Sequence, residues 1–99
     1  MAMLELTTDV STINLTVRGA VGRDGVDELR AALLDVEASP DSESVAIDLR
    51  EVTEFSRLGV AVLVAARRFF GDRLRIRLND AVLALVDEAG LTQVLRPGF

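Results

Sequence analysis

The stretch Asp48-Leu-Arg-Glu-Val-Thr-Glu-Phe-Ser-Arg-Leu-Gly-Val-Ala-Val-Leu63 decides the fold of this chain. Its start continues a short apolar run from Val45 that is typical of a strand, and a polar link follows. A helix comes next, and residues 58–66 of that helix carry no charged or strongly polar side chain. Such a helix must be covered on every side, whereas a helix in a two-layer domain has one face on the sheet and one in water. The excess apolar surface therefore predicts a protein partner.

Length and composition exclude several classes of function. Ninety-nine residues allow one domain, residues 1–99. The absence of cysteine excludes disulfides and thiolate metal sites, and the absence of histidine removes the commonest catalytic base and metal ligand. We therefore expect no enzymatic activity, no metal and no cofactor. The net charge of −5 argues against nucleic acid as a partner.

The sequence also argues against a membrane location. No apolar run approaches the roughly 20 residues needed to span a bilayer, and no charged leader is followed by a cleavage site. We therefore expect a cytoplasmic protein that does not insert into the membrane.

Hydropathy patterns along the chain predict the element order ββαβαβα. Alternation or short apolar runs predict strands at residues 4–8, 12–18, 44–49 and 73–78. Helical spacing predicts three helices and one further turn, over residues 24–38, 57–70, 80–89 and 91–95. We expect Asp24 to be the N-cap of the first helix and Gly90 to end the third in the left-handed conformation. The third helix is expected to bury Val82, Leu85, Val86 and Ala89.

This order predicts an α/β fold with a single-layer, mostly parallel sheet of four to five strands, because strand–helix–strand units need parallel pairing. Two strands nevertheless show clean one-sided alternation, which sheets covered on both faces lack. We therefore expect all helices to pack on one face. The other face, with Thr12, Thr16, Arg18 and the arginines at 73, 75 and 77, is expected to be solvated.

The motifs at these positions resemble those of a STAS domain of the anti-sigma factor antagonist type, from about Leu4 to Leu95. That family has a strand ending in Asp-Leu, a short link, Asp-Ser-Ser-Gly-Leu, and a helix rich in Leu and Ala. The matching positions here are Asp48-Leu49, Val52-Thr53, Gly59 and Ala65-Ala66-Arg67-Arg68. Arg18-Gly19-Ala20-Val21 resembles the family's turn before the first helix, and Ala89-Gly90-Leu91 its Gly-Leu after the last core helix.

The resemblance implies a regulatory switch. In phosphorylated members, a kinase that is also the anti-sigma factor modifies the second serine of Asp-Ser-Ser-Gly. The unmodified antagonist docks on that kinase through the same loop and helix, and so releases the sigma factor. An accessory subunit of a transport or signalling complex is the alternative, and a homodimer is compatible with either. The sequence ends at Phe99, and many relatives carry a further helix beyond the matching position.

The sequence departs from the family pattern at the phosphorylation motif. Ser56 replaces the aspartate, Arg57 the first serine and Leu58 the phosphoacceptor, while Gly22 replaces an aspartate of the earlier turn. Leucine has no hydroxyl, so we expect no phosphorylation at position 58. Ser56 and Thr53 are the nearby hydroxyls, and their spacing favours neither. We expect a binding module without phosphorylation at the family site.

The helix at 57–70 carries two apolar stripes on nearly opposite sides. By resemblance, the first stripe faces the sheet and the second a partner. The first consists of Val60, Leu63, Val64 and the stem of Arg67, and the second of Leu58, Ala61, Val62, Ala65 and Phe69. The expected partner-binding residues are Ser56, Arg57, Leu58, Gly59, Ala61, Val62, Ala65 and Phe69, with Gly22, Arg23 and Asp24 of the earlier turn. Alternatively, neighbouring helices or a homodimer mate cover the second stripe.

Three polar or small residues have a plain structural interpretation. Ser56 is expected to be the N-cap of the helix that it precedes. Gly59 is expected to permit close approach of a neighbouring backbone, and Asp48 to cap the loop beyond its strand.

Overall fold

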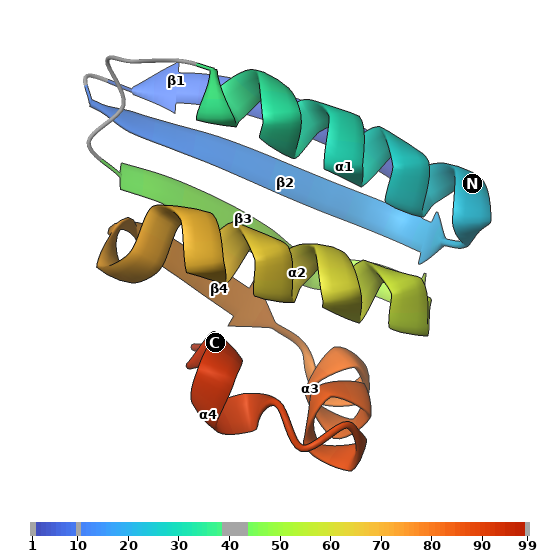
Figure 1. Ribbon diagram of the computed structural model, residues 1–99. Coiled ribbons are helices and arrows are strands. Elements are labelled where there is room, and N and C mark those ends of the chain that lie inside the picture. The colour runs from blue at the N-terminus through green and yellow to red at the C-terminus, as the bar shows by residue number, and fades with distance from the viewer. Residues whose placement is uncertain (1, 10, 39–43, 99) are drawn as a thin grey trace.

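A computed structural model describes residues 2–9, 11–38 and 44–98. Its elements follow the predicted order ββαβαβα, with an additional short helix near the C-terminus (Figure 1). The strands are β1 (Ala2–Asp9), β2 (Thr12–Val21), β3 (Ser44–Phe55) and β4 (Leu74–Leu78). The helices are α1 (Arg23–Glu37), α2 (Arg57–Phe70), the 3₁₀ turn η1 (Gly71–Arg73), α3 (Asp80–Glu88) and α4 (Thr92–Leu95).

The four strands form one sheet in the order β1-β2-β3-β4. β1 is antiparallel to β2, whereas β2, β3 and β4 are mutually parallel. Helices α1 and α2 lie over the same face of the sheet, and α3 and α4 pack near its β4 end (Figure 1). These observations confirm the predicted fold class, with four strands. No helix among the described residues is long and apolar enough to cross a membrane.

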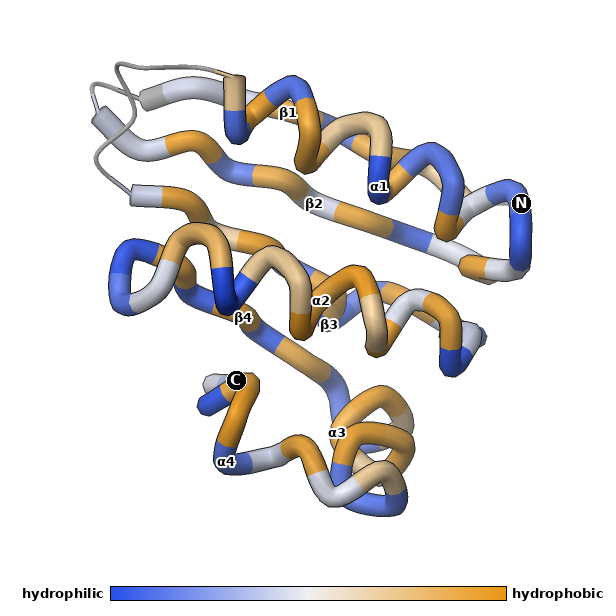
Figure 2. The backbone as a smooth tube through the Cα atoms, viewed as in Figure 1, coloured by the Kyte–Doolittle hydropathy of each residue, from blue (hydrophilic) through white to orange (hydrophobic). Residues whose placement is uncertain are grey.

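The core lies between the sheet and the two covering helices. β2 alternates buried and half-buried positions from Thr12 to Arg18, as its period-2 pattern predicts (Figure 2). The largest fully buried side chains come from three strands (β2, β3 and β4) and three helices (α1, α2 and α4): Leu15, Leu29, Ile47, Leu49, Leu63, Ile76, Leu78 and Leu95. The open face of the sheet keeps its polar side chains in contact with solvent.

β3 is longer than predicted because it is bulged. Its pairing with β2 shifts register between Thr16 and Arg18 and again between Gly19 and Ala20. Each shift inserts an extra β3 residue, so apolar and polar positions lose their two-residue phase after Leu49. The strand itself continues to Phe55. The prediction ended it at residue 49 because the two-residue period stops there.

Three details of the helices differ from expectation or confirm it. Gly22, not Asp24, is the N-cap of α1, and no side chain caps this helix; Asp24 lies in its first turn. Ala89 is exposed at the C-cap of α3, and only Val82 and Val86 of the predicted set are fully buried. Gly90 adopts the predicted left-handed conformation, with φ of 71°.

Candidate partner-docking site

The start of α2 is held by its own backbone and by the end of β2. Ser56 is the N-cap, as predicted: its hydroxyl accepts a hydrogen bond from the Leu58 backbone N–H at 3.1 Å. The Ser56 N–H donates to the Val21 carbonyl oxygen at 3.1 Å. Since Gly22 follows Val21, this bond brings the predicted turn at residues 22–24 beside the start of α2. The two predicted segments therefore lie together.

Gly59 allows a close contact, but the neighbour is a side chain of the same chain. A Cβ at this position would lie 2.5 Å from Cζ of the Phe55 ring, which real Cβ atoms do not tolerate. The expected close approach was to a backbone, so this detail differs. The ring of Phe55 thereby packs under the first turn of α2 and joins the end of β3 to the helix.

The outer side of α2 carries an exposed apolar stripe. Leu58 is 53% exposed and Phe69 is 54% exposed, and Ala61 and Ala65 between them are exposed as well. We call these four residues the outer stripe. Their spacing of three, four and four places them along one side of the helix. No helix or strand among the described residues covers this stripe.

Val62 does not belong to the outer stripe, which corrects the sequence prediction. It is only 6% exposed, because α1 packs alongside α2. Val62 lies with Leu33 and Leu34 of α1 in a shallow groove of about 200 Å³ between the two helices. Neighbouring helices therefore cover part of the second stripe, which was the alternative interpretation, while the rest stays exposed.

A second shallow apolar groove lies between α2 and the end of α3. It has a volume of about 200 Å³ and is lined by Arg57, Val60, Ala61, Leu85, Glu88, Ala89 and Leu91. The Arg57 and Glu88 side chains form an exposed ion pair across its rim, with 4.0 Å between Nη2 and Oε2. The contribution of α3 was missed from the sequence. The only available signal was the family turn at Ala89-Gly90-Leu91, which does not show which helix it approaches.

Arg67 fixes the opposite side of α2. We expected only its stem to pack on the sheet, but the guanidinium itself is buried. It donates to the carbonyl oxygens of Gly71 at 2.8 Å, Leu74 at 2.7 Å and Leu95 at 2.5 and 3.2 Å. Burial lowers the pKa of Arg67 from its usual range, and arginine nevertheless stays protonated in proteins. The helix is thus tied to β4 and α4 through its inner side.

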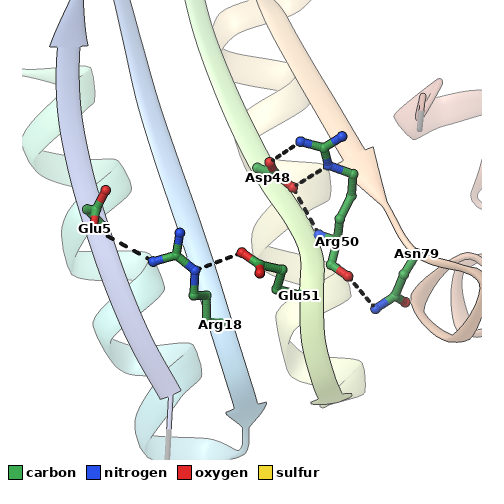
Figure 3. A network of polar contacts seen from close by, with 6 residues as sticks. All are labelled: Glu5, Arg18, Asp48, Arg50, Glu51 and Asn79. Atoms are coloured by element: carbon green, nitrogen blue, oxygen red, sulfur yellow. Dashed lines mark hydrogen bonds and ion pairs between the residues drawn. The ribbon is translucent and has the colours of Figure 1, made fainter.

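The open face of the sheet carries a polar network separate from α2 (Figure 3). Asp48 accepts hydrogen bonds from the Arg50 backbone N–H at 3.0 Å and from the Arg50 guanidinium at 2.8 and 3.0 Å. The sequence predicted that Asp48 would cap a loop after its strand. The strand continues instead, and these bonds hold its bulge. The side-chain hydrogen bond from Arg50 lowers the pKa of the Asp48 carboxyl. Asn79 donates to the Arg50 and Val52 carbonyl oxygens at 3.2 and 2.7 Å.

The hydroxyls nearest the start of α2 are those of Thr53 and Ser56. Thr53 is exposed on β3, and the Ser56 hydroxyl is engaged in capping α2. The described residues contain no group of three or more side chains suited to hold a metal ion. Arg75 and Arg77 project from the open face of β4 and are exposed.

Comparisons with known proteins place this arrangement in a family. An anti-sigma factor antagonist from Mycobacterium paratuberculosis is similar in structure, with a TM-score of 0.88 and 17% identity, over 99% of this chain and 86% of that one. The anti-sigma factor antagonist SpoIIAA in its unphosphorylated form gives 0.80 and 13%, over 98% and 89%. The phosphorylated form of SpoIIAA, a Bacillus cell fate determinant, gives 0.75 and 12%, over 98% and 92%.

These identities are low, so the structural likeness concerns the fold. No curated protein matches the sequence. The family model described as "Mlab, STAS domain" matches residues 4–97, nearly the whole chain. This chain belongs to the STAS domain family.

Proposed function

We propose that this chain is a protein-interaction regulator of the anti-sigma factor antagonist kind. It docks on a kinase-like anti-sigma factor through the start and outer side of α2, and docking releases a sigma factor. The observation that carries this proposal is the exposure of the outer stripe beside a capped helix start, on a fold shared with proteins described as anti-sigma factor antagonists. Exposed apolar side chains clustered in this way mark interfaces.

The docking surface combines an apolar centre with a charged rim. Leu58 and Ala61 form the centre near the helix start, and the Arg57–Glu88 pair borders it on the α3 side. The turn of Gly22, Arg23 and Asp24 borders it on the β2 side, through the bond between Ser56 and Val21. An apolar centre within a polar rim is the usual composition of a protein interface. The partner is thus expected to bring an apolar side chain opposite Leu58.

Binding is measured by isothermal titration of the cognate anti-sigma factor with the wild type and with Leu58→Glu. We expect Leu58→Glu to weaken binding about 30-fold or more, as truncation of an interface centre does. The matched control is Met3→Glu, which places the same charge at an exposed apolar position of β1 on the sheet, away from α2. Equal binding by wild type and Leu58→Glu would contradict the proposal.

The same surface is proposed to lack phosphorylation at the family position. Leu58 has no hydroxyl, so incubation with the cognate kinase and ATP should leave residues 57–59 unmodified in a mapped mass spectrum. Leu58→Ser serves as the matched variant, because it restores a hydroxyl at that position on an exposed side chain. Modification of Ser56 or Thr53 in the wild type would instead show that phosphorylation has moved to another residue.

An accessory subunit of a transport or signalling complex is the second candidate. Two observations favour it: Leu58 stands at the phosphoacceptor position, and the matching family model carries the description "Mlab, STAS domain". In that case the protein would co-purify with a larger complex and show no affinity for an anti-sigma factor. The Leu58→Glu variant would then be lost from that complex, because the docking surface is the same.

A further inference from the structure

The two outer edges of the sheet differ in whether another segment of the chain pairs with their backbone groups. At the β4 edge, Gly98 forms a bridge with Arg77: its N–H donates to the Ile76 carbonyl at 2.8 Å, and its carbonyl accepts from the Leu78 N–H at 3.0 Å. The C-terminal segment thus satisfies part of that edge. At the β1 edge, no described residue pairs with the outward-facing backbone groups. An open edge presents a row of donors and acceptors to another strand.

β1 lacks most of the features by which natural proteins protect such an edge, although its sequence includes the acidic residues Glu5 and Asp9. Its eight residues pair with β2 without any shift of register, from Ala2 opposite Gly19 to Asp9 opposite Thr12. The strand contains no proline, lysine or arginine and no bulge, each of which would discourage a further strand. It also exposes large apolar side chains on both faces, with Met3 65% and Leu6 51% exposed. β1 is therefore a regular edge with two exposed apolar side chains, and no described residue pairs with its outer side.

We propose that β1 pairs antiparallel with β1 of a second copy of this chain, so that two sheets join across a two-fold axis. In such a pair, directly opposite residues lie on the same face, and one residue pairs with its own copy at the axis. With Leu6 at the axis, the two exposed leucines pack against each other. Glu5 then lies opposite Thr7, and Leu4 opposite Thr8.

The registers centred on Glu5 and on Leu4 are less favourable than the one centred on Leu6. We therefore place Leu6 at the two-fold axis. With Glu5 at the axis, two carboxylates would lie directly opposite each other, and like charges in that position are destabilising. With Leu4 at the axis, the overlap shrinks to residues 2–6 and places Leu6 opposite Ala2. The register centred on Leu6 thus combines a long overlap with burial of the exposed apolar side chain.

The dimer is expected to be weak and dependent on concentration and salt. A single pair of strands buries less area than a standard stable interface. Each copy carries a net charge of −5, so the two copies repel each other and added salt screens that repulsion. This interface uses β1 and leaves the outer stripe of α2 free. The dimer and the proposed function can therefore be tested separately, and failure of one does not contradict the other.

Single cysteines test the pairing, because the natural chain contains none. In the Leu6→Cys variant, the two Cβ atoms at the axis would lie about 4.5–5.5 Å apart, close to the separation that a disulfide needs. The control is Leu34→Cys on α1, whose side chain is 57% exposed, slightly more than the 51% of Leu6. Under mild oxidation we expect Leu6→Cys to form a disulfide dimer about ten-fold faster or more, because pairing raises the effective thiol concentration.

Light scattering across a dilution series supplies the second measurement. The wild type should rise from 10.7 kDa toward twice that mass with concentration, and Leu6→Lys should remain monomeric with an unchanged circular dichroism spectrum. A wild-type mass that stays at one chain at every concentration and salt would overturn the proposal. A dimer in which Leu6→Cys reacts no faster than Leu34→Cys would also overturn it, because the interface would then lie elsewhere.

Discussion

The two sides of α2 differ in burial and in the polar contacts that they make. The inner side is fixed by complete burial: Leu63 is fully buried against the sheet, and Arg67 donates to three carbonyl groups. The outer side exposes Leu58 and Phe69, and among the residues that the structure describes it makes no comparable set of buried hydrogen bonds. One helix thus serves stability on one side and presents an apolar surface on the other. Substitutions of the same kind on the two sides should separate these roles.

The largest effect is expected from Arg67→Ala. This change leaves three largely buried carbonyl groups without a donor, each costing about 1–3 kcal/mol, so unfolding should become easier by about 3–5 kcal/mol. Arg68→Ala, the exposed neighbour on α2, is the control and should change stability by less than about 0.5 kcal/mol. Urea unfolding measures both. Similar losses for the two variants would contradict the contrast between the sides.

A leucine pair on the two sides gives the next comparison. Leu63→Ala should cost about 2–4 kcal/mol, because it removes fully buried apolar atoms and leaves a cavity. Leu58→Ala should cost less than about 0.5 kcal/mol, since that side chain is already half in water. Thermal and urea unfolding report the difference. If Leu58→Ala were as costly as Leu63→Ala, Leu58 would belong to the core and not to the docking surface.

Val62 marks the boundary between the two sides. Val62→Ala should cost about 1–2 kcal/mol because α1 buries this side chain, and it should leave binding to the partner nearly unchanged. The measurements are urea unfolding and titration of the anti-sigma factor. Ala65→Val, which adds apolar atoms to the adjacent exposed position, is the converse variant and should leave stability within about 0.5 kcal/mol. If Val62→Ala instead lost binding and kept its stability, Val62 would belong to the docking surface and not to the packing between α1 and α2.

The smallest effect extends the comparison to a polar contact on the open face. The pKa of the Asp48 carboxyl is lowered, chiefly by the hydrogen bond from the Arg50 side chain. Because the folded-state pKa lies below the unfolded-state value, this contact stabilises the protein above the unfolded pKa, and the stabilisation is lost as pH falls through the folded pKa. Asp48→Asn should therefore cost less than about 1 kcal/mol at neutral pH. The difference from the wild type should shrink in unfolding curves recorded toward acid pH. A constant difference at all pH values would argue against the charged contact.

Much of the architecture was predictable because it depends on local signals. The alternation in β2 and β4, the helical spacing of α1 and α2 and the left-handed Gly90 all follow from backbone geometry and side-chain polarity within a few residues. The Ser56 cap was predictable for the same reason, since a cap needs only its own helix start.

The errors arose where distant segments meet. The length of β3 depends on its pairing with β2, and the bulges in that pairing disturb the period on which a strand prediction relies. Asp24 has the right residue type for a cap, yet the N-cap of α1 lies two residues earlier, at Gly22. Such shifts of one or two residues are set by tertiary packing and not by local preference.

By itself, the amino-acid sequence determined the element order, the one-sided sheet and the presence on α2 of more apolar surface than one face needs, because these follow from the hydropathy of neighbouring residues. Only the tertiary structure decided how that surface is divided. α1 approaches α2 closely enough to bury Val62, while Leu58 and Phe69 stay exposed. A helical wheel places all three on one side of the helix, but the distance to a second helix depends on how both pack on the sheet.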